Sequence, residues 1–476
     1  MIPSDHFFLG GGAANTAMTP VAAVLLILAV AMILFGPRRY IVAPLLLAVF
    51  LVPSGNVVVL AGVHLMPIRI LAPAGWLRLV MSKRQAGESR FAFGYSDIDR
   101  AFLGFNIVTA VAVFLQWLTV SAITNQLGEL EGMLGMYFLL RQLIRNQEDV
   151  AFTIKVMVMT AVVSVAGMIN EHLTLHNAFG TLIGGVQTFP LVREGRIRSE
   201  GPFQHAILAG VFGATTLPLS LWLFKVRRSY GFAVTGILAG TGMVLLCASS
   251  TPVMAYAGTI FVVCLWPIRR SMQLLRRGLS FTLIALHMVM KAPVWFLIAR
   301  VDIIGGSASF DRANLIDTCV RHFSAWWLYG THDTGNWGWS MWDLSDQFVS
   351  VAETGGLLAI ILFIAVISRS FGRLGKARKA LAAAKKDEWG PWFLGAAVFA
   401  NILAYFGVSY FDQTVVSWYV LLSVIVVVTS QKLPEEIREP ALWESVSSPL
   451  LAEVGSDSAE SIWWTPEGLH TRCQSI

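Results

Sequence analysis

The feature that most constrains this chain is a series of apolar runs that are each close to twenty residues long. A helix rises about 1.5 Å per residue, so about 20 apolar residues are needed to cross the roughly 30 Å hydrocarbon core of a bilayer. The sequence therefore predicts an all-α protein, a polytopic bundle of about thirteen transmembrane helices within residues 1–430. The runs lie at about 18–35, 41–61, 67–82, 101–121, 129–146, 150–169, 203–224, 230–250, 251–268, 279–299, 347–368, 390–411 and 414–430.

Composition supports this prediction and excludes a soluble globular fold. Hydrophobic residues make up 55% of the 476 residues and charged residues only 13%, against about 25% charged residues in an ordinary soluble domain. The net charge of +6 comes from basic residues in short clusters between apolar runs. Anionic lipid and the positive-inside rule explain such clusters without a nucleic-acid partner. Four scattered cysteines favour neither a disulfide framework nor a metal cluster.

The basic clusters also predict an orientation, because cytoplasmic ends of membrane helices collect Lys and Arg. They fall at every second boundary, which places the N-terminus outside and the C-terminus inside. Long connections at about 170–202 and 300–346 then lie on the extracytoplasmic side, where function is expected to concentrate. The polar, acidic segment 431–476 is predicted to be a disordered cytoplasmic tail. The clusters are Arg38 and Arg39; Lys83, Arg84 and Arg90; Arg141 and Arg145; Lys225, Arg227 and Arg228; Arg269, Arg270, Arg276 and Arg277; and Arg369, Arg373, Lys376, Arg378, Lys379, Lys385 and Lys386.

The first outer loop carries three arginines on the side that should be poor in them. Arg193 and Arg196 suit interfacial side chains that reach lipid headgroups, and Arg196 is also a candidate substrate contact. Arg198 lies seven residues before His205, at a Gly-Pro helix entry where backbone N–H groups and a guanidinium would bind an anion such as phosphate. For His205, a polar residue at a helix start and a catalytic residue are both open interpretations.

The second outer loop interleaves aromatic rings with carboxylates, a histidine and an amide. His332, Trp337, Trp339 and Asp343 lie within this stretch, which continues into a helix that contains Glu353. Such a mixture is typical of sugar-binding surfaces, because rings stack on pyranose faces while polar groups bind hydroxyls. An interfacial loop with an aromatic belt is the alternative interpretation.

Taken together, the motifs of the two loops resemble those of the O-antigen ligase and polysaccharide polymerase superfamily, and within it the exopolysaccharide polymerases. The likeness covers about 190–370 by order, spacing and residue type, and the rest of the chain only by hydropathy. The motif residues are Arg198-x-x-Gly201-x-Phe203-x-His205, Arg312-x-x-Leu315, Gly330, and Asp343-x-x-Asp346-Gln347-Phe348 leading to Glu353-x-Gly355-Gly356.

The resemblance implies a multi-pass glycosyltransferase of the bacterial inner membrane. Its donor would be a polyprenyl diphosphate-linked oligosaccharide, and a glycan or lipid hydroxyl would attack with inversion, without a metal or other cofactor. Arg198 and Arg312 would hold the departing diphosphate, because arginine stays protonated and binds phosphate bidentately. Membrane lipid and other polysaccharide export or chain-length proteins are the candidate partners. Contacts to substrate are expected from Asp346, Gln347, Trp337, Trp339 and Glu353.

The base that activates the attacking hydroxyl is less well defined by the sequence. Ligases of this superfamily carry a His-Asn pair where this chain has Leu344 and Ser345. Asp343 is the favoured replacement, in a stretch that looks like the exopolysaccharide polymerase variant of the motif. The other candidates for the base are Asp346, His332 and His205.

Three other functions stay open on the sequence. A ligase would transfer finished glycan to an acceptor, and a flippase would carry the same lipid-linked sugars across the membrane. A flippase should place charges inside several helices at midplane depth, whereas here they gather in two loops. A cytoplasm-facing transferase would use Asp97 and Asp99 to hold a divalent cation, although a helix cap is the simpler role for that pair.

Overall fold

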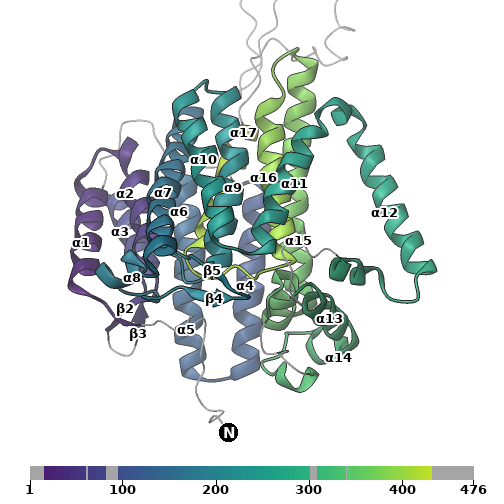
Figure 1. Ribbon diagram of the computed structural model, residues 1–476, viewed down its shortest axis with the longest axis horizontal. Helices are drawn as coiled ribbons and strands as arrows, with labels where there is room; N and C mark the ends of the chain where they lie inside the picture. The colour runs from purple at the N-terminus through teal and green to yellow at the C-terminus, as the bar shows by residue number, and fades with distance from the viewer. Residues whose placement is uncertain are drawn as a thin grey trace, which may run out of the picture. The chain divides into compact units, whose positions relative to one another are not determined.

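A computed structural model describes residues 16–60, 63–81, 95–300, 308–338, 341 and 344–430. Within these residues the chain is mostly helical, with two small sheets that an all-α prediction did not include (Figure 1). The tail 431–476 and the predicted site residues Trp339 and Asp343 lie outside the described residues.

The helices vary in length from the single turn of α14 to the long, kinked helix α15. The α-helices are α1 (Pro20–Phe35), α2 (Val42–Leu51), α3 (Pro67–Met81), α4 (Asp97–Trp117), α5 (Val120–Leu130), α6 (Met136–Leu143), α7 (Gln147–Thr174), α8 (Ala178–Leu182), α9 (Ala206–Lys225), α10 (Tyr230–Leu246), α11 (Ser250–Cys264), α12 (Met272–Val289), α13 (Ala308–Arg321), α14 (Phe323–Trp326), α15 (Gln347–Ala383), α16 (Trp389–Tyr405) and α17 (Thr414–Ser430). A π-helical turn, Glu131–Gly135, joins α5 to α6, and 3-10 turns occupy Arg38–Tyr40, Trp266–Ser271, Val294–Arg300 and Gly335–Trp337.

The strands are short and lie between helices. Strand β1 (Thr16–Ala17) pairs in parallel with β2 (Asn56–Leu60), which pairs antiparallel with β3 (Val63–Leu65). Strands β4 (Leu191–Arg193) and β5 (Arg196–Arg198) form a hairpin inside the first predicted outer loop. The second predicted loop is not irregular either, because it contains helices α13 and α14.

At least two predicted spans are wrong as continuous helices. The run 279–299 leaves the α-helix at Val289 and continues as the 3-10 turn Val294–Arg300. The run 41–61 folds as α2, which ends at Leu51, followed by strand β2. Pro53 has no backbone N–H, and the Ser54-Gly55 turn behind it reverses the chain, so the apolar residues beyond the turn satisfy their backbone groups in a sheet instead. Hydrophobicity alone does not distinguish these outcomes.

Four described helices are long and apolar enough to cross a membrane: α4, α7, α9 and α15. A fifth is counted if Ser250–Cys264 and Trp266–Val289, which bend by 79° at their junction, form one span. Helices α1, α10 and α17 are apolar but shorter. The described residues therefore fit a membrane protein with four or five candidate spans.

Local signals in the sequence explain where the long helices begin. Ser96 and Asp99 form a reciprocal capping box at the start of α4. The side chain of Asn146 caps α7, and that of Asp346 caps α15. Each cap satisfies backbone N–H groups that the first turn of a helix leaves free.

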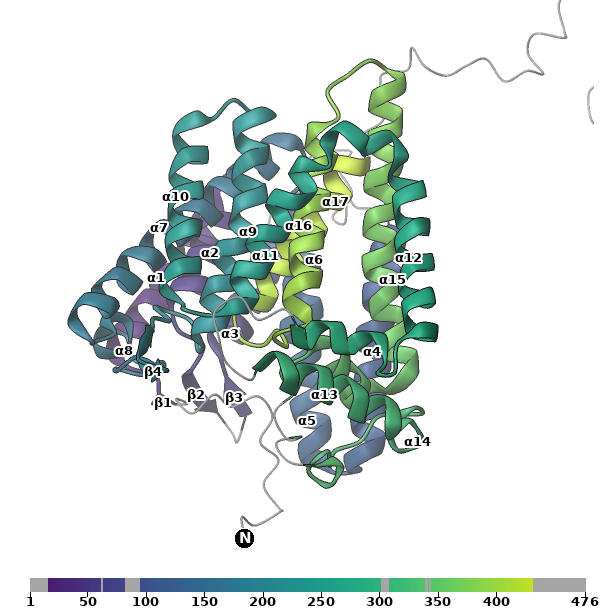
Figure 2. The same ribbon diagram turned by 45° about the vertical axis from the view of Figure 1, so that its right-hand side comes forward.

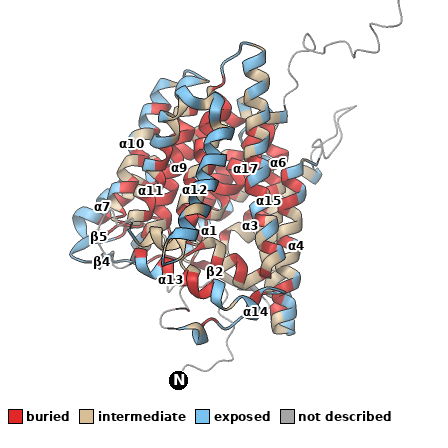
Figure 3. Ribbon diagram, turned by 90° about the vertical axis from the view of Figure 1, so that its right-hand side faces the viewer, coloured by how far each residue is buried: buried red, intermediate tan, exposed pale blue. Residues whose placement is uncertain are grey.

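The two ends of the bundle carry different connections (Figures 1 and 2). The connections α9–α10 and α15–α16 lie at its upper end, whereas the β4–β5 hairpin, the β1–β2–β3 sheet and helices α13 and α14 lie at its lower end. Buried residues concentrate inside the bundle, and α12 has none (Figure 3). Both long loops therefore lie at one end.

At the upper end, arginines of the basic clusters form ion pairs with acidic residues of neighbouring segments. Arg373 pairs with Asp97 at 2.8 Å, joining α15 to the start of α4. Glu388, just before α16, pairs with Arg269 at 3.4 Å and with Arg378 at 3.2 Å. Residues that the charge alternation assigned to the same side thus contact one another.

Candidate functional site

The segment that follows the β4–β5 hairpin is fixed to the end of α7. One carboxylate oxygen of Glu171 accepts hydrogen bonds from the backbone N–H groups of Glu200 and Gly201, at 3.1 and 2.9 Å. This attachment holds Arg198, the last residue of β5, in a buried position, whereas Arg196 on the same strand is exposed. Arg196 and Arg198, two residues apart in the sequence, therefore differ in burial.

Arg198 is a buried cation at this end of the molecule. Arg198 is only 5% exposed, and its Nε has no hydrogen-bond partner among the described residues. Desolvation lowers the pKa of the guanidinium, and nearby Arg193 lowers it further. A buried charge without full compensation is costly, and an anionic ligand would remove that cost.

His205 has a structural role in α9. Its Nδ1 accepts a hydrogen bond of 3.1 Å from the backbone N–H of Ile207, so the imidazole is the N-cap of the helix. Burial and the neighbouring Arg198 lower the pKa of His205 to about 4. The ring is therefore neutral at physiological pH, with its Nδ1 already occupied.

In the second loop, Arg312 lies close to the carboxylate that starts α15. Arg312 is 7% exposed and its charge lowers the pKa of Asp346. Desolvation outweighs this effect and raises the pKa of Asp346 to about 6. Oδ1 of Asp346 accepts hydrogen bonds from the N–H groups of Phe348 and Val349, at 2.8 and 3.1 Å, so this predicted substrate contact is also a helix cap.

The aromatic residues of the second loop pack against protein rings. Trp337 stacks on His322 with an angle of 9° between the planes. The exposed ring of His332 packs on Trp117, at the end of α4, with 4.9 Å between the ring centroids. One face of Trp337 is therefore covered by the protein.

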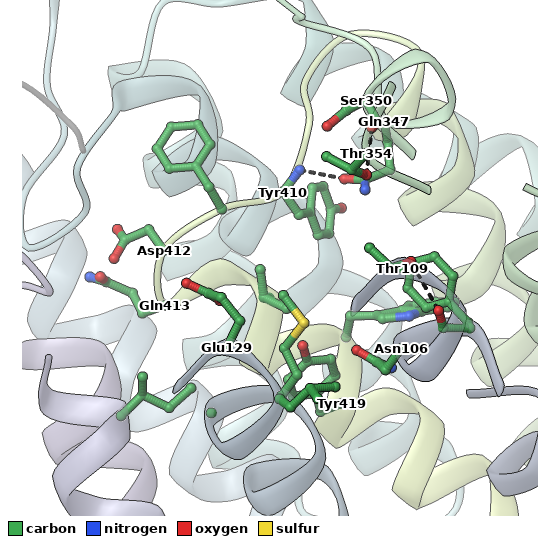
Figure 4. Close-up of a pocket in the computed structure, with 18 of the residues that line it drawn as sticks. Asn106, Thr109, Glu129, Gln347, Ser350, Thr354, Tyr410, Asp412, Gln413 and Tyr419 are labelled. Atoms are coloured by element: carbon green, nitrogen blue, oxygen red, sulfur yellow. Dashed lines mark hydrogen bonds between the residues drawn. The ribbon is translucent and has the colours of Figure 1, made fainter. Parts of the chain in front are cut away.

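A cavity of about 390 Å³ lies between the two motif regions (Figure 4). Gln204 from the first motif and Gln347 from the second both line it, whereas Arg198 and Arg312 do not. Its apolar wall includes Phe102, Phe105, Met133, Phe363, Tyr405 and Trp418. Its polar wall consists of Ser54, Arg69, Asn106, Thr109, Gln126, Glu129, Gln204, Gln347, Ser350, Thr354, Tyr410, Asp412, Gln413 and Tyr419.

The sequence analysis missed a segment that joins the two motifs, residues 410–413 between α16 and α17. The backbone N–H of Tyr410 donates to Oε1 of Gln347 at 2.5 Å. The backbone N–H of Gln204 donates to Oδ2 of Asp412 at 3.1 Å. Polar residues between two apolar runs are the signal that would have drawn attention to this segment.

A second missed feature is an ion pair in the cavity wall. Arg69 of α3 and Glu129 of α5 are 2.8 Å apart and both line the cavity. Arg69 also donates to the carbonyl oxygen of His64 at 3.0 Å. Neither residue belongs to one of the motifs, so the order and spacing of the motif residues gave no reason to select Arg69 or Glu129.

The Asp97-x-Asp99 pattern has structural roles. Asp99 is fully buried, caps its own helix and bonds Arg141 at 3.1 Å, while Asp97 pairs with Arg373. Among the described residues, no group of three or more His, Cys, Asp or Glu side chains is placed to hold a metal ion. The simpler interpretation of this pattern, a helix start, is the one that the geometry supports.

The described helices and the cavity define the class of protein only broadly, as a mostly helical protein with long apolar helices that fit a membrane. No protein-family model and no curated protein matches this chain.

Proposed function

We propose that this chain is an integral membrane glycosyltransferase that polymerises lipid diphosphate-linked oligosaccharide repeat units into a secreted bacterial polysaccharide. The observation that carries the proposal is Arg198, a buried guanidinium whose Nε has no partner among the described residues. Gln204, six residues further along the same motif, lines a cavity with a polar wall. Arg312 supplies a second buried cation from the other long loop. Two arginines suit a diphosphate, which carries more than one negative charge.

The reaction is an inverting displacement at the anomeric carbon of the donor. The hydroxyl of an acceptor glycan attacks this carbon, and the lipid diphosphate leaves with the electron pair of the broken bond. Positive charge fixed near the departing diphosphate stabilises the transition state, where negative charge develops. The arginines perform this role, so the chemistry needs no metal or other cofactor.

We assign the site to the extracytoplasmic face of the bacterial inner membrane. The α9–α10 and α15–α16 connections, which carry basic clusters, lie at the opposite end of the bundle from the β4–β5 hairpin and helices α13 and α14 (Figures 1 and 2). This arrangement supports a cytoplasmic basic end under the positive-inside rule. About thirteen crossings, with the N-terminus outside and the C-terminus inside, are part of the proposal. Some crossings then use helices shorter than a full span, such as α10 and α17.

Two residues of the second motif favour polymerisation over ligation. Leu344 and Ser345 stand where the superfamily's ligases carry a His-Asn pair, and a leucine side chain neither accepts a proton nor binds a hydroxyl. A base for polymerisation has to come from another residue. The alternative, a ligase, differs in its product, which carries one transferred glycan and no lengthened chain.

The test uses the purified full chain in liposomes with lipid-linked repeat units extracted from the producing cells. Wild-type protein is expected to lengthen the glycan, and Arg198→Ala and Arg312→Ala each to slow lengthening by about 100-fold or more. Arg193→Ala is the matched control, because Arg193 is an exposed arginine in the same hairpin. If both alanine variants lengthen glycan at the wild-type rate, the diphosphate site is wrong. If glycan moves once to a separate acceptor, the protein is a ligase.

A further inference from the structure

Asp412 occupies a distinctive position in the cavity wall. It lies in the segment between α16 and α17, and its backbone has a φ of 62°, in the left-handed region that Asp and Asn tolerate better than most residues. Ser54 donates its hydroxyl hydrogen to Oδ1, and the backbone N–H of Gln204 donates to Oδ2. Both oxygens are therefore oriented, and the cavity reaches the side chain (Figure 4).

We propose that Asp412 is the general base of the transfer, and that the cavity beside it holds the terminal sugar of the acceptor glycan. This inference rests on the proposed function. An ionised carboxylate has about four acceptor sites, so Asp412 keeps capacity for one sugar hydroxyl after accepting from Ser54, Gln204 and the backbone of Gln413. Planar polar groups and rings on the same wall, including Gln347 and Tyr419, suit a hydroxyl-rich ligand.

The proton balance of the step is complete within the site. The acceptor hydroxyl oxygen forms a bond to the anomeric carbon, the bond from that carbon to the diphosphate oxygen breaks, and its electron pair leaves on the lipid diphosphate. The hydroxyl proton passes to Asp412 and from there to water. No oxidant, reductant or metal takes part.

The position of Asp412 relative to the arginines fits this division of roles. Inversion requires attack from the side opposite the leaving group, so the base and the diphosphate must lie on different sides of the donor sugar. Asp412 lines the cavity, whereas Arg198 lies outside it. The backbone N–H of Gln204, six residues after Arg198, donates to Asp412, and the charges of Asp412 and Arg198 both shift the pKa of Glu200, so the two groups lie in the same region of the fold.

Among the described residues, the other carboxyl groups and histidines near the cavity are less suited to the task, and Asp343 lies outside this part of the chain. Asp346 does not line the cavity, and the Nδ1 of His205 is bonded within its own helix. Glu129, which does line the cavity, is paired with Arg69. Desolvation raises the pKa of Asp412 to about 7, near the value that favours proton acceptance at neutral pH.

The test is Asp412→Asn, which keeps the shape of the side chain and tolerates the left-handed backbone. Transfer by this variant is expected to be at least ~100-fold slower than wild type, with binding of undecaprenyl diphosphate within about twofold of wild type. Asp387→Asn, an exposed carboxylate just before α16, is the control and is expected to keep the full rate.

The pH profile separates a base from a purely structural residue. In wild type, the transfer rate should rise with pH through about 7 as Asp412 ionises, and this rise should disappear in Asp412→Asn. Glu200, Arg198 and the Arg69–Glu129 pair face the same region and remain present in both proteins. A variant that keeps more than about a tenth of the wild-type rate, or a slow variant with the wild-type pH rise, overturns the assignment. A wild-type protein that transfers no glycan instead overturns the proposed function.

Discussion

At the scale of single residues, acidic side chains around Arg198 set the electrostatics of the site. Glu200 is 6% exposed, and its Oε1 has no hydrogen-bond partner in the described part of the chain. Burial, and then the nearby carboxyl group of Glu171, raise the pKa of Glu200 to about 8, although Arg198 opposes this. Glu200 therefore holds a proton at neutral pH, and the charge of Arg198 is left for an anionic ligand.

This pKa predicts how stability depends on pH. The folded-state pKa of Glu200 lies above its ordinary value of 4.5, so the folded protein binds more protons between these values and loses stability as the pH rises from about 4.5 to about 8. The pKa of Asp412 is raised to about 7, so this residue also lowers the stability of the folded protein as the pH rises. The loss from one such group is at most about 1.4 kcal/mol per pH unit.

Glu200→Gln, which is neutral at all pH values, should flatten this dependence. Melting temperatures of the purified protein in detergent, measured from pH 5 to pH 8, report the effect. Wild-type protein is expected to melt at a lower temperature at pH 8 than at pH 5, with a smaller difference in the variant. Equal slopes in the two proteins would contradict a buried, protonated Glu200.

At the scale of elements, helix α15 is broken where the second motif ends. Gly356 has a φ of 71° within the helix, so the chain kinks there. The kink exposes backbone groups that the loop before α15 binds. The N–H of Leu357 donates to the carbonyl oxygen of Trp327 at 2.9 Å, and the N–H of Thr331 donates to that of Glu353 at 2.8 Å. The motif glycines thus build the contact between this helix and the second loop.

Gly330 makes that contact possible, because it has a φ of 84° and lies directly against the kink. A Cβ at this position would be 2.0 Å from the carbonyl oxygen of Glu353. Gly330→Ala should therefore cost about 2 kcal/mol or more in stability, from strain and steric clash together. The decrease in melting temperature measures this cost.

Gly195→Ala in the β4–β5 turn is the matched control. Gly195 has a φ of 72°, yet a Cβ there would have no atom within 4 Å. Only the strain of the left-handed backbone applies, at about 1 kcal/mol. If the two alanine variants lose the same stability, the loop does not pack against the kink as described.

At the scale of the whole molecule, the α9–α10 and α15–α16 connections, which carry basic clusters, lie at the opposite end of the bundle from the β4–β5 hairpin and helices α13 and α14 (Figure 2). The two long loops are tied to each other through residues 410–413, since Asp412 binds the first motif region and Tyr410 binds the second. One site is thereby assembled from segments that are about two hundred residues apart in the sequence.

The proposed orientation predicts which residues are accessible from outside the cell. Cysteines introduced at exposed Arg196 and Asn336 should react with a membrane-impermeant maleimide in right-side-out spheroplasts. A cysteine at Arg227, in the α9–α10 connection, should react only after lysis. Cys264 and Cys473 are first replaced by alanine, and buried Cys319 is retained. Labelling of Arg227→Cys in intact spheroplasts would reverse the proposed orientation.

Parts of this architecture were predictable because they depend on local physics. Apolar runs predicted most of the long helices, since an apolar stretch of twenty residues has few other ways to satisfy its backbone in a membrane. Charge alternation assigned to one side two clusters that Glu388 bridges through Arg269 and Arg378. Local hydrophobicity could not separate a helix from a helix followed by a strand at 41–61, because both bury apolar side chains.

What the sequence determined by itself is the class of fold and the two segments that supply Arg198 and Arg312. Their burial, and the different surroundings of Arg196, were decided only by tertiary contacts such as those of Glu171 with the segment after the hairpin. The helix caps made by His205 and Asp346 are local, because each side chain binds backbone N–H groups two or three residues further on. The position of Asp412 in the cavity is a tertiary result. The physical reason is that burial, desolvation and hydrogen-bond partners come from residues distant in the sequence, whereas apolar periodicity and charge are carried by each segment alone.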